Sequence, residues 1–234
     1  MLGFVFDVDD TLYEQIVPFR DAYNKLFKHK VDIEKLYCLS RYYSDEKFED
    51  SRNGNITIDE YHIYRVKQAA KDLNIELSDK EALNFQKEYK KNQGCLVLTK
   101  LTKGILDYCL GNNIKLAVIT NGPSEHQRSK VKALGLENWI SKDKIIVSGN
   151  FGINKPDKRI FEYMEEKLKI EKQELFYIGD SIENDVIGAN NAGWNVIWIN
   201  RYNQAIPQGA KVYKEVKNNE ELFIELKKII KESL

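Results

Sequence analysis

Residues 4–12 read Phe4-Val5-Phe6-Asp7-Val8-Asp9-Asp10-Thr11-Leu12, and they place three carboxylates directly after an apolar run. Like charges this close repel one another, and their burial without partners is unfavourable. If residues 2–6 form a central parallel strand, Asp7 lies at its carboxyl end, where open α/β sheets bind ligands. A cluster such as Asp9-Asp10-Thr11 is commonly a turn or a helix N-cap, and Asp10 is expected to be such a residue. The stretch therefore predicts a buried strand that carries an acidic pair to a functional edge.

The composition argues against two classes of partner. The 36 basic and 36 acidic side chains balance, so nothing indicates binding to nucleic acid or to an anionic membrane. The most apolar segments, such as residues 114–119, are far shorter than a membrane span, and no secretory signal is visible.

Three cysteines, Cys38, Cys95 and Cys109, form no CxxC pair, which disfavours a disulfide framework or a zinc site. We therefore expect a cytoplasmic protein with reduced thiols.

Five short runs rich in β-branched or aromatic residues predict the strands of a buried sheet. They span residues 2–6, 115–120, 144–148, 175–178 and 195–200. Helical patterns lie between four of these runs, which is typical of βαβ units and predicts a doubly wound, Rossmann-like α/β core with a parallel sheet. In one of these patterns, Ser124 and Gln127 have the spacing of a capping box, and Gly135 predicts the end of the same helix.

The segment between the first two predicted strands is much longer than an ordinary crossover connection. Its pattern is helical throughout, and Thr57-Ile58-Asp59-Glu60 and Ser78-Asp79-Lys80-Glu81 are capping boxes ahead of amphipathic stretches. We therefore expect a separate helical domain at residues 14–94, inserted into an α/β core made of residues 1–13 and 95–234.

Polar side chains follow the other strands at the edge where their carboxyl ends meet. They are Thr120-Asn121-Gly122 after the second strand, Lys155-Pro156 after the third, and Asp180 and Asp185 after the fourth. Clustered carboxylates favour a hard divalent cation, and Mg²⁺ prefers oxygen ligands. A lysine, a hydroxyl and backbone amides can hold the oxygens of a phosphoryl group. Together these groups predict phosphoryl chemistry at one rim of the sheet.

The charges at this rim can be balanced on paper. Asp7, Asp9, Asp180 and Asp185 supply four negative charges. Mg²⁺ and Lys155 return three positive charges, so one carboxylate is expected to carry a proton, as a general acid must.

Four segments resemble, in order and spacing, the four motifs of the haloacid dehalogenase-like superfamily. They are residues 7–11 (DVDDT), 120–122 (TNG), 155–157 (KPD) and 179–185 (GDSIEND). The helical insert after the first motif resembles that superfamily's first type of cap domain. The resemblance therefore spans nearly the whole chain and implies the superfamily's core with an inserted cap.

The resemblance also implies roles for the matching residues of the first motif. Asp7 would be the nucleophile that attacks phosphorus and becomes an aspartyl phosphate. Asp9 would protonate the leaving oxygen and then activate water, and Thr11 would help to orient Asp9. Because the dehalogenases of the superfamily lack an acid at this second position, Asp9 favours phosphate-ester chemistry.

The other motifs would hold the substrate and the metal. The resemblance implies that Thr120 and the Asn121 amide grip phosphoryl oxygens, and that Lys155 neutralises charge on the nucleophile and the phosphate. It implies Mg²⁺ as the cofactor, bound by the Asp7 carboxylate, the Asp9 backbone carbonyl and Asp180. Asp185 would act on the same metal directly or through water.

We therefore expect a Mg²⁺-dependent phosphatase for small phosphorylated metabolites, with the cap reading the leaving group. Residues 53–57 (NGNIT) are similar to the cap entry of phosphatases acting on nucleoside monophosphates and other small metabolites, so those substrates and sugar phosphates come first. Gly149 and Lys158 depart from the acid and the proline that many relatives carry, which puts the transfer of a particular substrate in doubt.

Three other functions remain open at this point. A phosphotransferase or phosphomutase would share every motif and pass the phosphoryl group to a sugar hydroxyl. A signalling receiver domain is also phosphorylated on aspartate, but its lysine comes last along the chain, whereas Asp180 and Asp185 follow Lys155 here. The third is a catalytically silent binding protein on the same scaffold, which the intact motif residues argue against: Asp7, Asp9, Thr120, Lys155 and Asp180. The oligomeric state, monomer or dimer, is open as well.

Overall fold

Six parallel strands form one sheet, five of them at the apolar runs that predict strands. Their order is β3-β2-β1-β4-β5-β6, with β1 and β4 at the centre. The strands are β1 (Gly3–Phe6), β2 (Lys115–Thr120), β3 (Ile145–Val147), β4 (Leu175–Gly179), β5 (Asn195–Ile199) and β6 (Lys214–Val216). The predicted α/β class is confirmed. The edge strand β6 was not predicted, because only Val216 of its three residues is buried.

The computed structural model describes residues 1–28 and 30–233, and the chain divides into two units. One unit comprises Met1–Glu14 and the chain from Leu96 onward, and it contains the sheet. In the other unit, Gln15–Cys95, the described residues form four helices.

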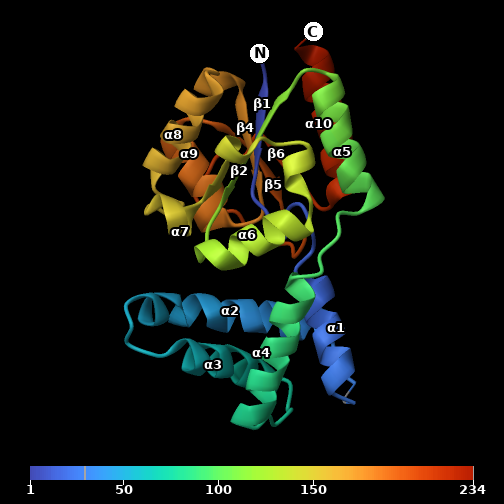
Figure 1. Ribbon diagram of the computed structural model, residues 1–234, viewed down its shortest axis with the longest axis vertical. Coiled ribbons are helices and arrows are strands. Elements are labelled where there is room, and N and C mark those ends of the chain that lie inside the picture. Colours follow the sequence, from blue (N-terminus) through green and yellow to red (C-terminus); the bar gives the residue numbers. More distant parts are fainter. Residues whose placement is uncertain (29, 234) are drawn as a thin grey trace. The chain divides into compact units, whose positions relative to one another are not determined.

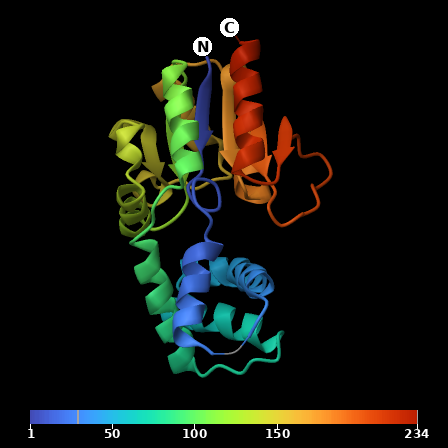
Figure 2. The same cartoon turned by 90° about the vertical axis from the view of Figure 1, so that its right-hand side faces the viewer.

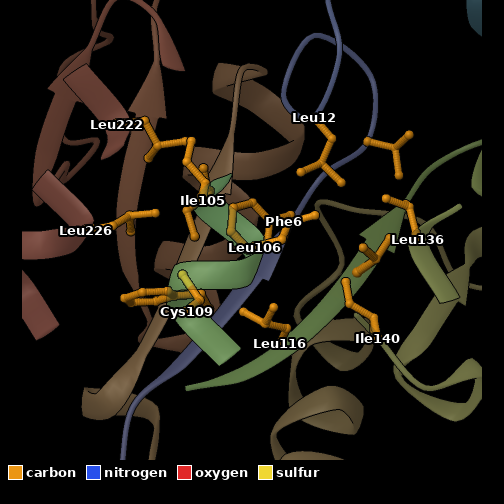
Figure 3. Close-up of a cluster of buried hydrophobic side chains, with 14 of the residues drawn as sticks. Phe6, Leu12, Ile105, Leu106, Cys109, Leu116, Leu136, Ile140, Leu222 and Leu226 are labelled. Carbon is orange, nitrogen blue, oxygen red and sulfur yellow. The ribbon is translucent and has the colours of Figure 1, made fainter. Parts of the chain in front are cut away.

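The two faces of the sheet bury separate hydrophobic cores because side chains alternate along each strand. Phe4 and Phe6 face the core formed with α5 (Lys100–Gly111) and α10 (Asn219–Glu232). Figure 3 shows this core from close by, with Leu106 next to Phe6. Val5 faces the other core, formed with α8 (Lys158–Leu168) and α9 (Gly188–Ala192). Figure 1 shows α8 and α9 on one side of the sheet and α5 and α10 on the other, and Figure 2 shows α5 and α10 side by side.

The strand register aligns the carboxyl ends of β2, β1 and β4. Phe6 pairs with Val118 on one side and with Ile178 on the other. The Asp7 amide continues the ladder by donating to the Ile178 carbonyl at 2.9 Å. The residues that follow these three strands therefore emerge at the same edge.

One helix boundary differs from its prediction. Helix α6 (Ser124–Ala133) begins at Ser124 itself, with Pro123 in the N-cap position and no capping side-chain hydrogen bond. The predicted capping box is therefore wrong, and the Gln127 side chain is used elsewhere. Gly135, two residues after the helix, adopts a left-handed φ of 64°, as expected for a helix end.

The remaining elements of this unit are short. They are α7 (Ser148–Phe151), a π-helical turn at Ile182–Ile187, and 3₁₀ turns at Leu136–Asn138, Lys142–Lys144 and Lys172–Glu174.

The second unit is a helical bundle around aromatic side chains. Its helices are α1 (Ile16–Leu26), α2 (Ile33–Arg52), α3 (Ile58–Lys71) and α4 (Asp79–Gln93). Both predicted capping boxes are present, at Thr57 with Glu60 and at Ser78 with Glu81. Phe19 makes edge-to-face contacts with three rings of the bundle, at centroid distances of 4.8–5.6 Å. Across the described residues, every helix is too short or too polar to cross a bilayer.

Two helical glycines provide a matched test of packing. A Cβ on Gly188 would lie 2.9 Å from the buried ring of Phe161 and 3.0 Å from the Pro156 Cα, whereas a Cβ on Gly104 would meet nothing within 4 Å. We expect Gly188→Ala to lower the free energy of unfolding by about 1–3 kcal/mol through overpacking. Gly104→Ala should raise it by about 0.5–1 kcal/mol through helix propensity. Urea unfolding followed by tryptophan fluorescence measures both, since all three tryptophans lie in the sheet-containing unit. Equal effects of the two substitutions would contradict the packing described.

Candidate active site

Three carboxylates from two strand ends converge at the edge of the sheet. Asp7, Asp180 and Asp185 each offer an oxygen atom, and these atoms all lie within 4.8 Å of one another. Asp7 follows β1, Asp180 follows β4, and Asp185 lies on the π-helical turn. Grouped carboxylate oxygens of this kind suit a hard divalent cation.

Asp185 reaches this position because a glycine leaves room for it. A Cβ on Gly179 would lie 2.3 Å from Asp185 Oδ2, so β4 can end only in glycine here. The same Oδ2 accepts a hydrogen bond from the Ser181 amide at 3.0 Å.

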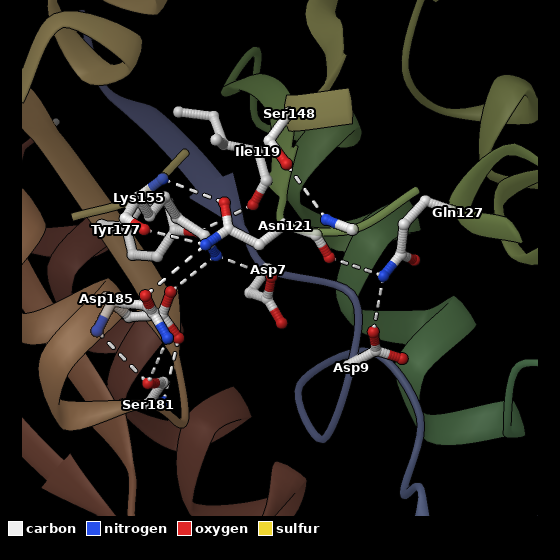
Figure 4. A network of polar contacts seen from close by, with 12 residues as sticks. Asp7, Asp9, Ile119, Asn121, Gln127, Ser148, Lys155, Tyr177, Ser181 and Asp185 are labelled. Carbon is white, nitrogen blue, oxygen red and sulfur yellow. Dashed lines mark hydrogen bonds and ion pairs between the residues drawn. The ribbon is translucent and has the colours of Figure 1, made fainter. Parts of the chain in front are cut away.

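Lys155 joins the cluster as a fully buried cation with three acceptors. Its Nζ donates to Asp7 Oδ1 at 2.8 Å, to Asp185 Oδ1 at 2.6 Å and to the Tyr177 hydroxyl at 2.7 Å (Figure 4). An ammonium has three N–H donors, so every one is used. Burial opposes its charge, but Asp185 and Asp7 hold the pKa of Lys155 above its ordinary value.

Asp7 experiences opposing electrostatic effects. Burial raises the pKa of Asp7 to about 7 against the attraction of Lys155, and the charges of Asp185 and Asp9 add to the rise. Positive charge at the carboxylate cluster would favour the ionised form of Asp7, because an opposite charge at close range lowers a carboxyl pKa.

The Asn121 side chain fixes the backbone of Lys155. Its Oδ1 accepts from the Lys155 amide and its Nδ2 donates to the Lys155 carbonyl, both at 2.9 Å. The loop after β2 is thereby tied to the segment that carries the lysine. At the end of β2, the Thr120 hydroxyl is buried and has no hydrogen-bond partner among the described residues.

Asp9 is held by a second set of side chains. Lys130 Nζ donates to Asp9 Oδ1 at 2.7 Å and to Oδ2 at 2.8 Å, and Gln127 Nε2 donates to Oδ2 at 2.9 Å. The Tyr13 hydroxyl also donates to Oδ1. Burial disfavours the charge of Asp9, but Lys130 and these hydrogen bonds keep the Asp9 pKa well below its usual range.

The second buried lysine changes the predicted charge balance. Lys130 is 3% exposed and pairs with Asp9, so the four carboxylates face two lysines rather than one. With a divalent cation, four positive charges meet four negative ones, and neutrality no longer requires a protonated acid.

The Thr11 side chain does not belong to the set that contacts Asp9. Its hydroxyl is buried without a hydrogen-bond partner among the described residues, so it makes no hydrogen bond to the Asp9 carboxylate. The hydrogen bonds to that carboxylate come from Tyr13, Gln127 and Lys130. Asp10 is buried in the turn with a φ of 53°, and this confirms its prediction as a turn residue.

The comparisons with known proteins agree with this geometry. The family model described as haloacid dehalogenase-like hydrolase matches residues 4–199. The chain belongs to this hydrolase family. Its resemblance to the superfamily is thus confirmed, and the purely non-enzymatic alternatives lose their support.

Individual relatives match this hydrolase to different extents. It is 27% identical to pyrimidine 5'-nucleotidase YjjG of Escherichia coli over 211 residues, which cover 87% of this chain and 88% of that protein. It is 35% identical to phosphoserine phosphatase of Thermus thermophilus over 88 residues, and this match covers only 34% of that enzyme. The HAD-hydrolase YfnB from Bacillus subtilis, solved with magnesium, has the same fold, with a TM-score of 0.71 and 22% identity over 96% of this chain and 98% of that one.

Several site residues of this hydrolase were missed in the sequence. Gln127, Lys130, Val131 and Leu134 have the i, i+3, i+4, i+7 spacing of one helix face, and all four are buried. A glutamine and a lysine on the apolar stripe of α6 were therefore a readable signal. Tyr177 gave no such signal, since it lies within the apolar run of β4.

Tyr177 offers a test of the lysine network. Its hydroxyl donates to the Ile119 carbonyl at 2.8 Å and accepts from Lys155, and burial raises its pKa well above the ordinary value. Tyr177→Phe leaves a buried carbonyl and an ammonium N–H without this partner, so we expect the free energy of unfolding to fall by about 1–3 kcal/mol. Tyr163→Phe, at an exposed tyrosine on α8, should change it by less than about 0.5 kcal/mol. Urea unfolding compares the two variants, and equal stability would argue against the network.

Proposed function

We propose that this hydrolase is a Mg²⁺-dependent phosphatase for small phosphorylated metabolites, acting through an aspartyl phosphate on Asp7. The observation that carries the proposal is the contact of buried Lys155 with Asp7, which is itself one of the three grouped carboxylates. A nucleophile, a cation and a metal-binding oxygen cluster at one strand edge are what phosphoryl transfer requires.

The Thr120 hydroxyl supports the same proposal. It is a buried polar atom without a partner among the described residues, and it lies one residue past the level of Asp7 in the strand register. A phosphoryl oxygen would satisfy it, together with the Asn121 amide and Lys155.

In the proposed reaction, an Asp7 oxygen attacks phosphorus while the bond from phosphorus to the leaving oxygen breaks. Asp9 gives a proton to that oxygen. Water then attacks the phosphorus, Asp9 takes its proton, and the bond to Asp7 breaks to release inorganic phosphate.

The metal would be held by this chain's own oxygens. Asp7, Asp180 and Asp185 would contribute carboxylates and Asp9 its backbone carbonyl. When bound, Mg²⁺ would neutralise phosphoryl charge and orient the oxygens for in-line attack. YfnB, which shares the fold, is described as bound to magnesium.

The substrate class rests on relatives and on the inserted unit. YjjG is a pyrimidine 5'-nucleotidase, so nucleoside monophosphates and sugar phosphates are the first substrates to test. Residues 15–95 would act as a cap that reads the leaving group and excludes water. The cytoplasm fits this proposal, because the cysteines at 38, 95 and 109 are free thiols.

Removal of the nucleophile or of the metal tests the mechanism. We expect Asp7→Asn to lower kcat by at least about 10³-fold, because the group that forms the intermediate is lost. EDTA should abolish turnover, and added Mg²⁺ should restore it. Release of inorganic phosphate from a panel of nucleoside monophosphates and sugar phosphates measures both effects.

Asp107→Asn, at an exposed position of α5, serves as the control and should keep full activity. Activity that survives both EDTA and Asp7→Asn would refute the mechanism. An isomerised phosphosugar in place of inorganic phosphate would instead favour the phosphomutase alternative.

Removal of the Thr120 hydroxyl is expected to leave the stability of the fold nearly unchanged. Thr120→Val deletes a buried hydroxyl that has no partner within the described structure, so stability should stay equal or rise. The value of kcat/KM should fall about 10²-fold, as on loss of one donor to a developing negative charge. Thermal unfolding and steady-state kinetics measure the two effects. A large loss of stability with unchanged kinetics would assign Thr120 to the core instead.

A further inference from the structure

The Asp9 carboxylate is held by side chains from two distant segments of the chain. Both of its oxygens accept hydrogen bonds, from Tyr13 in its own loop and from Gln127 and Lys130 on α6. Gln127 and Lys130 lie 118 and 121 residues further along the chain. Figure 4 shows Gln127 pointing at Asp9, on the opposite side of the view from Lys155 and Asp185.

Gln127 and Lys130 lie on the buried face of helix α6. Gln127 and Lys130 are each 3% exposed, whereas the neighbouring Arg128 and Lys132 are exposed. Lysine is rarely buried unless it is paired, and the bidentate contact with Asp9 supplies the partner. The spacing of three residues puts both donors on one face of the helix.

Gln127 also connects Asp9 to the loop after β2. Its Nε2 donates to the Asn121 carbonyl at 2.8 Å as well as to Asp9. A Cβ on Gly122, where φ is 145°, would lie 2.9 Å from the same nitrogen, so a side chain at this position would displace the Gln127 amide. One side chain thus sets the position of Asp9 relative to the segment proposed to hold phosphate.

We propose that Gln127 and Lys130 are positioning residues that hold the Asp9 carboxylate in place for proton transfer to the leaving group. This inference rests on the proposed function. The Asp7–phosphorus bond forms as the bond to the leaving oxygen breaks, and that oxygen keeps the electron pair and takes the Asp9 proton. Gln127 and Lys130 touch neither phosphorus nor the leaving oxygen in this scheme; they act through Asp9.

The proposal predicts a dependence on the leaving group. A sugar alkoxide leaves poorly without a proton, whereas p-nitrophenolate leaves readily without one. We expect Lys130→Met to lower kcat/KM for a sugar phosphate by about 10²-fold, the usual contribution of general acid catalysis. The loss for p-nitrophenyl phosphate should be several-fold smaller. Lys132→Met, two residues along on the exposed side of α6, should match the wild-type protein with both substrates.

The Asp9→Asn background separates positioning from a general structural effect. If Lys130 acts through Asp9, Lys130→Met should cause little further loss of kcat/KM once Asp9 is Asn. If Lys130→Met does not fold alone, Gln127→Met leaves the Lys130–Asp9 ion pair in place and should show the same leaving-group dependence. Equal losses with both substrates, or an equal loss in the Asp9→Asn background, would overturn the proposal.

A stability cycle distinguishes failure of this inference from failure of the proposed function. Urea unfolding of the single and double variants at Asp9 and Lys130 should show coupling between them without any turnover. Coupling in stability together with no Mg²⁺-dependent phosphate release by the wild-type protein would reject the proposed function and, with it, the role in proton transfer. Phosphate release that needs Asp7, with no coupling between Asp9 and Lys130, would reject the positioning role alone.

Discussion

The buried ammonium of Lys155 is the interaction on which the arrangement of the sheet edge depends. A buried charge must be paired and hydrogen-bonded. Removal of only one partner of a buried ion pair is strongly destabilising, because the other charge stays buried without a partner. Lys155 meets this requirement through Asp7 after β1, Asp185 after β4, and Tyr177 within β4. Its backbone is clamped by Asn121 after β2. One side chain and its peptide therefore join every segment that contributes to the edge.

Asp7 and Asp9 each have their own lysine, and the two pairs create different environments. Burial raises the pKa of Asp7 to about 7 despite Lys155, whereas Lys130 keeps the pKa of Asp9 low despite burial. The protein alone thus favours a proton on Asp7 over one on Asp9. The proposed reaction needs the reverse. Positive charge at the carboxylate cluster would lower the pKa of Asp7, and an incoming phosphoryl group would raise that of Asp9. The protonation states that the reaction needs, an ionised Asp7 and a protonated Asp9, are therefore expected to depend on metal and substrate together.

The sequence predicts those parts of the fold whose cause is local. Buried parallel strands are continuous apolar runs, so five of the six strands are found at their predicted places. Motif residues at strand ends are predicted because register aligns those ends, and the structure brings Asp7, Lys155, Asp180 and Asp185 together. Gln127 and Lys130 lie on a readable buried stripe of α6, but their contact with Asp9 could not be predicted because Asp9 lies more than a hundred residues away in the chain. The role expected for Thr11 came from the family resemblance and not from a local pattern, and the hydrogen bond that Asp9 receives from its own loop comes from Tyr13.

The spacing of the two acids explains how three carboxylates can follow one strand. Val8 separates Asp7 from Asp9 and is fully buried in the same core as Phe6 and Leu12. Apolar packing on this residue anchors the backbone between the acids, so that neither carboxylate can relax toward the other by a simple shift of the loop. Asp7 is left with Lys155 and Asp9 with Lys130, while Asp10 turns the chain with a left-handed φ. The repulsion between the carboxylates that follow β1 is thus reduced, because Asp7 and Asp9 are kept apart and each pairs with a different buried lysine. For that reason, loss of either lysine is expected to affect its own acid first.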